Sequence, residues 1–208
     1  INALIVNNLS TRFTIYSGKE NGFRENVYQN NIDSNSKSEK LVRNKTIWSP
    51  TSNFQTVITS LIVDQDNKYD VWAPDNNELL QTYSNSYGKD SQNSKAISIK
   101  NSWFNTGNKN LISITAYSIN KSEHSYDGDW GNSDFWSQAP YNVDGWDYSA
   151  IETTIRDRST FTQELRLLGN INNHSSFVSG IYFKNQIENY DLNGYWDGEY
   201  SLAGKFKN

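Results

Sequence analysis

The chain has 208 residues and a formal net charge of -4, and it contains no cysteine. The lack of cysteine excludes disulfide frameworks, thiolate metal sites and cysteine nucleophiles, and the acidic balance excludes the basic surface of a nucleic-acid-binding protein. Hydrophobic residues make up only 35% of the chain, many of them aromatic, and no apolar run approaches the roughly 18 residues of a membrane-spanning helix.

Short segments of alternating polarity, bounded by Asn, Ser, Asp and Gly, recur along the chain and predict β-strands rather than helices. The first such segment is residues 9–15, and a later one is residues 97–103. Residues 54–63 and 111–119 carry apolar side chains on both faces, so they are predicted as strands without a face assignment. The predicted fold class is therefore all-β.

The clearest predicted hairpin combines residues 158–168 and 176–188. Alternation along a strand sends successive side chains to opposite faces, which separates apolar from charged residues here. The predicted apolar face carries Phe161, Leu165, Leu167, Phe177, Ile181 and Phe183, whereas the other face carries Arg158, Glu164, Arg166 and Lys184. Two interpretations follow: a membrane barrel with apolar residues outward and charged residues in the lumen, or a soluble sheet with a wet charged face.

The predicted connections alternate in length. Short ones lie at residues 49–53, 105–110 and 169–174, whereas long ones lie at residues 18–38, 65–94 and 123–155, and another begins near Tyr190. In an antiparallel up-and-down sheet, this alternation collects the short turns at one end and the long loops at the other. Such sorting is typical of outer-membrane barrels, so we predict about eight strands of a larger transmembrane β-barrel.

Three segments resemble TonB-dependent receptors, a family of outer-membrane transporters. Residues 161–167 (FTQELRL), followed by residues 180–183 (GIYF), resemble the mid-barrel hairpin of this family. Residues 48–53 (WSPTSN) are similar to its Trp-x-Pro-Thr-x-Asn periplasmic turn, and residues 126–130 (YDGDW) to its aromatic, Asp-rich loops. The resemblance extends over nearly the whole chain and is weakest before Leu41.

The resemblance implies a barrel of about 22 strands with a plug domain inside it. It also implies TonB-energised uptake of a ferric siderophore, cobalamin or an oligosaccharide across a Gram-negative type of outer membrane, with lipid, TonB and the nutrient as partners. The sequence lacks the family's plug, TonB-contacting box and terminal aromatic strand, and it opens at Ile1 without a methionine. We therefore expect residues 1–208 to be an incomplete barrel domain that lacks the plug and the C-terminal strands.

Catalytic and metal chemistry receive little support from the sequence. The spacing of Asp127, Asp129 and Asp134 does not match a calcium-binding loop, because glycine stands at the fifth position and glutamine at the twelfth. The topology sends His124 and His174 to opposite ends of the sheet. A paired-carboxylate hydrolase using Asp127 and Glu152 is the enzymatic alternative. Otherwise we expect no enzyme, no metal and no cofactor.

The predicted ligand site lies in the long loop at residues 123–155, which is rich in rings: Trp130, Phe135, Trp136, Tyr141, Trp146 and Tyr148. Rings that flank strands, such as Trp48 and Trp103, suit an interfacial girdle, whereas rings deep in a loop are free to stack on a ligand. The candidate ligand-binding residues are Asp127, Asp129, Trp130 and Trp136. The alternative to a transporter is a secreted carbohydrate-binding β-domain that uses the same loop tryptophans.

Overall fold

A computed structural model describes residues 1–104, 108–142, 149–172, 174–196 and 199–207. Its main body is one nine-stranded sheet, so the predicted all-β class is confirmed. In spatial order the strands are β1 (Asn2–Val6), β2 (Leu9–Glu20), β4 (Lys37–Thr51), β5 (Phe54–Lys68), β7 (Lys89–Trp103), β8 (Lys109–Asp127), β9 (Ala150–Asn172), β10 (Ser175–Trp196) and β11 (Glu199–Lys207).

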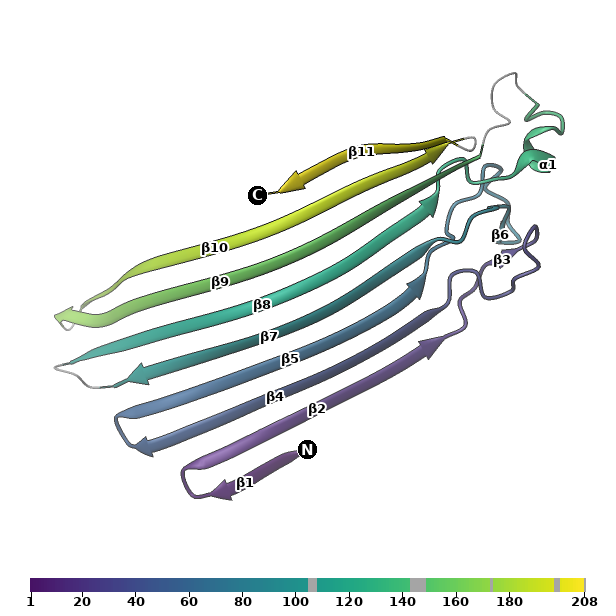
Figure 1. The fold of residues 1–208 in the computed structure, drawn as a ribbon. Helices are drawn as coiled ribbons and strands as arrows, with labels where there is room; N and C mark the ends of the chain where they lie inside the picture. The colour runs from purple at the N-terminus through teal and green to yellow at the C-terminus, as the bar shows by residue number, and fades with distance from the viewer. Residues whose placement is uncertain (105–107, 143–148, 173, 197–198, 208) are drawn as a thin grey trace.

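Every neighbouring pair in this sheet is antiparallel, and spatial order follows chain order, which confirms the predicted up-and-down topology (Figure 1). Strands β1 and β11 form its two edges, so over the described residues the sheet is open rather than closed into a barrel. The described part of the chain contains no helix that is long and apolar enough to cross a membrane.

The connections sort by length as predicted, with one exception: β10 ends at Trp196 and β11 begins at Glu199, so only two residues separate these strands at the long-loop end. The β4–β5, β7–β8 and β9–β10 connections lie at one end of the sheet, and the long β2–β4, β5–β7 and β8–β9 connections lie at the other (Figure 1). The long connections hold the other elements: β3 (Glu25–Asn26), β6 (Gln81–Thr82) and a one-turn helix, α1 (Ser133–Trp136).

The prediction of a long loop beginning near Tyr190 is wrong. Strand β10 continues to Trp196, and β11 begins at Glu199. Each residue of 190–196 pairs with one of 150–156 in β9, so the backbone ladder holds this polar segment extended without help from apolar alternation. For the same reason the other long loops are shorter at both ends than predicted.

The strand register divides the side chains into two faces. Cross-strand pairs such as Leu165 with Ile181, and Leu111 with Leu167, bring together on one face all six apolar residues predicted to share it. We call this side the apolar face; its further members include Phe13, Ile15, Val42, Trp48, Phe54, Ile58, Ile62, Ile97, Ile99, Trp103, Tyr117, Ile119 and Ile187.

The opposite side, which we call the polar face, carries most of the charged residues of the sheet's middle rows. Its members are Arg12, Arg43, Lys45, Lys100, Arg156, Arg158, Glu164, Arg166, Lys184 and Glu188. The register also resolves the strands whose faces the sequence left open. In β5, Ile58 and Ile62 lie on the apolar face, and Leu61 lies on the polar face.

Polar side chains on the apolar face bind one another. Thr56 donates to Asn101 at 2.8 Å, Thr115 donates to Gln163 at 2.6 Å, and Gln163 donates to Ser113 at 3.1 Å. A similar cluster joins Thr11, Asn44 and Thr46. Removing a polar group from water costs free energy unless the group finds a new hydrogen-bond partner. These side chains find their partners within the sheet.

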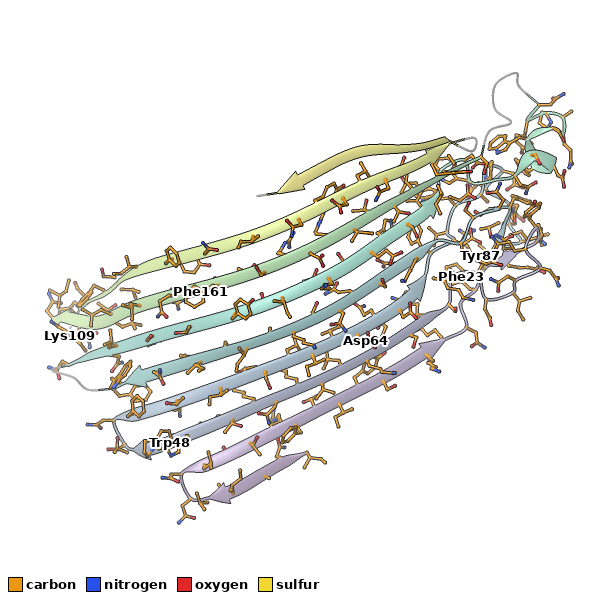
Figure 2. All side chains as sticks on the ribbon, viewed as in Figure 1. Phe23, Trp48, Asp64, Tyr87, Lys109 and Phe161 are labelled. Carbon is orange, nitrogen blue, oxygen red and sulfur yellow. The ribbon has the colours of Figure 1, made fainter. Side chains whose placement is uncertain are left out.

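The apolar face has no protein cover among the described residues. Ile181 and Phe183 are 73% and 55% exposed, and the buried hydrophobic residues of the described part are Trp136 and Ala150, both at the loop end. Phe161 and Trp48, which are labelled in Figure 2, also belong to this exposed face. The sheet therefore requires an apolar environment on one side to shield these residues from water.

A substitution at Gly180 would test the close approach of β9 and β10. A Cβ at this position would lie 2.6 Å from the backbone oxygen of Leu165, and backbone atoms have no low-energy way to withdraw. Gly180→Ala should destabilise the sheet by about 1–3 kcal/mol, measured as urea unfolding of the chain refolded in detergent. Ser179→Ala, on the other face of β10, is the control; equal stability of the two variants would contradict the pairing.

Candidate functional site

The three long loops interlock at one end of the sheet. We call them loop 1 (residues 21–36), loop 2 (residues 69–88) and loop 3 (residues 128–149, of which 128–142 and 149 are described). Strand β3 of loop 1 pairs with β6 of loop 2 in parallel, Glu25 with Gln81 and Asn26 with Thr82. The backbone of Val27 also donates to Thr82. Loops 1 and 2 are therefore joined by main-chain hydrogen bonds.

A buried carboxylate holds this junction. Asp70 accepts hydrogen bonds from the Asn26 amide at 3.0 Å, the Thr82 hydroxyl at 2.6 Å and the Ser84 hydroxyl at 2.9 Å. Asn26 and Thr82 are fully buried, and Asp70 nearly so. Loops 1 and 2 thus share a polar core in which Asp70 accepts the buried donors of Asn26, Thr82 and Ser84, as low-dielectric surroundings favour.

Loop 3 attaches to loop 2 through both polar and aromatic contacts. The backbone N–H of Asn85 donates to Gly131, and the Asn132 amide donates to the Tyr83 carbonyl at 2.7 Å. Asn132 also caps α1 by accepting from the Phe135 N–H, and the Tyr83 and Phe135 rings lie 4.5 Å apart. The three loops form one unit, which we call the loop cap.

Two buried carboxyl groups organise loop 3. Asp127 accepts the backbone N–H of Ser86, Asp129 and Trp130 at 2.9–3.2 Å, and Asp129 accepts the Ala150 N–H at 2.9 Å and the Trp136 indole N–H at 3.2 Å. Their exposed fractions are 4% and 3%. Burial, followed by the hydrogen bond and charge of Asp129, raises the pKa of Asp127 to about 7.

Trp130 is held in an unusual conformation at the surface of the cap. Its φ of 57° lies in the left-handed region, which is rare for a bulky residue, and the bond from its N–H to Asp127 stabilises this geometry. The indole stacks on Trp72 of loop 2 with ring centroids 5.9 Å apart. Trp130 is 41% exposed and Trp72 is 56% exposed, so the pair presents an aromatic surface to solvent.

The four predicted ligand-binding residues lie together, but they differ in exposure. Trp130 is at the surface, whereas Asp127, Asp129 and Trp136 lie in the interior of loop 3 and bind its own backbone and side chains. Their contact with a ligand stays a prediction, and the geometry favours Trp130 alone for direct contact. Trp146 and Tyr148 lie outside the described residues.

Sequence reasoning missed Trp72 and Asp70. Trp72 stands in a segment rich in Asp, Asn and Pro, and a lone ring in such a segment gave no periodic pattern to interpret. Asp70 resembles any solvated turn residue, because its partner Asn26 is 44 positions away. The sequence indicates these two residues only by placing an aspartate and a tryptophan two positions apart in a long loop.

The described residues do not form the carboxylate pair or the metal site that the sequence analysis considered. Asp127 pairs with Ile151 and Tyr126 pairs with Glu152, so Asp127 and Glu152 point to opposite faces and do not make a carboxylate pair. Among the described residues there is no group of three His, Cys, Asp or Glu side chains placed to hold a metal ion. His124 and His174 lie at opposite ends of the sheet, as predicted.

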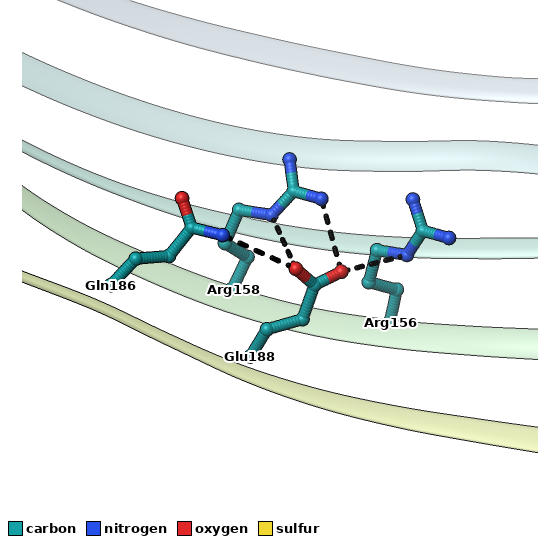
Figure 3. A network of polar contacts seen from close by, with 4 residues as sticks. All are labelled: Arg156, Arg158, Gln186 and Glu188. Atoms are coloured by element: carbon teal, nitrogen blue, oxygen red, sulfur yellow. Dashed lines mark hydrogen bonds and ion pairs between the residues drawn. The ribbon is translucent and has the colours of Figure 1, made fainter. Parts of the chain in front are cut away.

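The polar face has an ion network below the loop cap (Figure 3). Glu188 binds Arg158 through two bonds of 3.0 and 3.2 Å, lies 3.0 Å from the Arg156 guanidinium, and accepts a bond of 3.3 Å from Gln186. Nearer the middle of the same face is a hollow of about 510 Å³, lined mostly by small side chains, including Ala96, Ser98, Ala116, Ser118, Thr160 and Thr162. The polar face therefore offers charge and space to whatever lies against it.

No protein-family model matches the chain, and no curated protein matches it either. The features that bear on function are therefore the two faces of the sheet and the loop cap.

Asp70 provides a direct test of the loop cap. Asp70→Ala removes the shared acceptor of three buried donors, each of which costs about 1–3 kcal/mol when left unsatisfied. We expect faster hydrogen exchange in loops 1 and 2 and unchanged exchange in β9 and β10, measured by mass spectrometry. Glu78→Ala, an exposed carboxylate in loop 2, should change neither region. Protected loops in Asp70→Ala would show that the cap does not depend on this core.

Proposed function

We propose that the chain forms part of the wall of an outer-membrane β-barrel receptor of the TonB-dependent type, which takes up a scarce nutrient such as a ferric siderophore, cobalamin or an oligosaccharide. One observation carries the proposal: the large apolar side chains exposed along the middle of the sheet lie almost entirely on one face. An amphipathic antiparallel sheet with sorted connections suits a barrel wall between lipid and a polar lumen.

The dimensions of the apolar face support a membrane location. From Phe177 to Ile187 the apolar residues of β10 extend about 33 Å along the strand, which corresponds to roughly 25 Å of height at the usual barrel tilt. That height equals the apolar band of known outer-membrane barrels. We call this part of the apolar face, from the row of Phe177 to the row of Ile187, the belt; its height is consistent with a bilayer's hydrocarbon core.

The borders of the belt differ in chemistry. At the short-turn end, the Phe54 ring lies 6.4 Å from Trp48 and 5.2 Å from Trp103, an aromatic cluster suited to a lipid interface. Toward the loops, charged residues replace apolar ones on the same face: Lys40, Asp64, Lys121 and Asp157 share one row of the sheet. Strands β8 and β9 continue beyond this row, so the loop cap would stand clear of the membrane.

Four polar groups of the belt are bonded within the sheet, and the charged Lys95 lies in its last apolar row, beside Ile62 and Ile119. Thr56, Asn101, Thr115 and Gln163 make hydrogen bonds to neighbours on the same face, so none of them would enter hydrocarbon unsatisfied. A soluble sheet has water for these groups and does not need the arrangement.

In such a receptor the loop cap would face the outside and meet the nutrient. The exposed indoles of Trp72 and Trp130 are the surface that we assign to ligand contact, while Asp127, Asp129 and Trp136 hold that surface in place. Energy from TonB would reach the ligand through a plug domain, for which the basic residues and the hollow of the polar face provide a wall.

The alternative is a secreted carbohydrate-binding β-domain, and the same Trp72–Trp130 pair favours it because exposed indoles stack on sugar rings. The two proposals differ in the environment of the apolar face. A secreted domain needs protein over that face, whereas a barrel needs lipid.

Substitutions at two neighbouring aromatic residues of β10 distinguish the two proposals. Phe183 lies on the apolar face and Tyr182 on the polar face, and both side chains are largely exposed. In a barrel, Phe183→Lys should reduce insertion into lipid vesicles by about 2–4 kcal/mol, roughly 30- to 1,000-fold, because the lysine meets hydrocarbon. Tyr182→Lys should insert as the original chain does.

Insertion is measured as protease-protected protein and as heat-modifiable migration on a gel. Equal insertion of Phe183→Lys and Tyr182→Lys would rule out a lipid-facing Phe183. A chain that forms soluble oligomers in water, and does not bind vesicles, would favour the secreted domain.

The ligand surface has its own test. Replacing Trp72 and Trp130 together with Ala should weaken binding by about 5- to 150-fold, from the loss of roughly 1–3 kcal/mol of stacking and burial. The probes are a ferric trihydroxamate chelate, cobalamin and maltohexaose, each followed by tryptophan fluorescence. Trp103→Ala, at the turn end, should lower stability and leave affinity unchanged. Equal affinity in the double variant would remove the indole pair from the ligand site.

A further inference from the structure

A hollow of about 330 Å³ lies where the three loops meet. Its lining comes from all of them: Val27 and Tyr28 of loop 1, Tyr83 of loop 2, and Asn132, Asp134, Phe135 and Gln138 of loop 3. This volume is at the lower end of the range found for small-molecule sites. Trp72 and Trp130 do not belong to the described lining, so the hollow is a second feature of the loop cap that is open to a ligand.

Hydrogen bonds and ring contacts within the cap hold the walls of the hollow. The Asn132 amide donates to the Tyr83 carbonyl at 2.7 Å and accepts the Phe135 N–H at 2.9 Å. The Tyr83 hydroxyl donates to Asp75 at 2.7 Å, and the Tyr83 and Phe135 rings lie 4.5 Å apart. The cap itself therefore sets the shape of the hollow.

The polar atoms left open on these walls are mainly hydrogen-bond acceptors. Within the part of the chain that the structure describes, the Asp134 carboxylate makes no hydrogen bond and no ion pair; its main-chain carbonyl alone is bonded. That carbonyl accepts the Gln138 amide N–H at 2.9 Å, which leaves the side-chain oxygen of Gln138 open. The described lining includes no Lys, Arg or His. Such walls complement a ligand group that donates several hydrogen bonds and carries a positive charge.

The charge of the whole loop cap favours the same kind of ligand. The described residues of the three loops contain one basic side chain, Arg24, and seven carboxyl groups: Glu25, Asp33, Asp70, Asp75, Glu78, Asp129 and Asp134. An excess of one sign of charge concentrates ions of the opposite sign near a surface and repels ions of the same sign. Cations are therefore drawn toward the hollow, and anions are kept from it.

The rest of the lining suits an alkyl chain. Val27 is apolar, and Tyr28 is 51% exposed, so its ring is accessible. Methylene groups can lie along such a surface while a charged end stays with its hydrogen-bond partners. An aromatic ring close to a cation adds a further attraction.

We propose that this hollow binds a primary ammonium group at the end of an alkyl chain, with the ammonium at Asp134 and the chain along Val27, Tyr28 and Tyr83. A primary ammonium has three N–H donors for the open acceptors, whereas a quaternary ammonium has none. The site goes beyond the proposed function, because the cap has the same walls whether lipid or protein covers the apolar face.

Two amino-acid amides test the site in the full chain in detergent micelles, by isothermal titration calorimetry at low salt. Nα-acetyl-lysinamide carries the ammonium, and Nα-acetyl-norleucinamide has the same four-carbon side chain without it. The lysine compound should bind about five- to tenfold more tightly, since an exposed ion pair and a cation–π contact each contribute modestly. Equal affinities, or no binding of the lysine compound, would overturn the proposal and leave the barrel proposal untouched.

Two carboxylate variants separate the site from the general charge of the cap. Asp134→Asn keeps the shape of the side chain, and we expect it to bring the affinity for the lysine compound down to that for the norleucine compound. Glu78→Gln removes one negative charge from loop 2 outside the hollow, and it should retain the original preference. Equal losses in the two variants would show attraction by the acidic cap alone and would overturn the site.

Tyr28→Ala provides an independent check on the walls. It should weaken binding of both compounds, because the alkyl chain loses a surface that the two share. Hydrogen exchange in loop 3 should stay as in the original chain in Asp134→Asn and in Tyr28→Ala, which shows that the cap is intact. Unchanged affinities in both variants would place the ammonium elsewhere and refute the assignment.

Discussion

The antiparallel hydrogen-bond register is the constraint on which the rest of the structure depends. A side-chain period of two means that a slip of one residue would exchange the faces of a whole strand. The pairing of Leu165 with Ile181 and of Glu164 with Tyr182 keeps β9 and β10 in phase, and the same holds strand by strand to β2. The exposed belt and the charged face are therefore consequences of one backbone arrangement.

The buried residues of the structure lie mainly in the loop cap rather than in the sheet. Among the described residues, the buried polar ones other than Thr56 and Ser102 lie at the loop end, where hydrogen bonds such as those to Asp70 hold them. Hydrogen bonds are directional, so a polar core fixes geometry more strictly than an apolar core of equal size. This explains how loops of such length keep a defined surface for Trp72 and Trp130.

The sequence predicts the sheet better than the cap, for a physical reason. Alternation at Phe161, Leu165 and Leu167 is a local pattern that one strand contains by itself, and loop sorting follows from strand spacing. The cap depends on pairs such as Asn26 with Asp70 and Asn85 with Ser149, whose members are 44 and 64 positions apart and chemically ordinary. The extension of β10 past Tyr190 escaped prediction because its extended form comes from its neighbours and not from its own side chains.

The junction of sheet and cap shows how the two parts are coupled. At the last rung of β8 and β9, the Gly128 N–H donates to the Ala150 carbonyl at 2.8 Å, and the Ala150 N–H then turns to the Asp129 carboxyl instead of a strand carbonyl. A side chain thus replaces the backbone as acceptor at the point where the strands separate. The ladder below consists of main-chain bonds alone, whereas this acceptor is a side chain of loop 3. A substitution at Asp129 would therefore affect loop 3 before it affects the strands that position the loop cap.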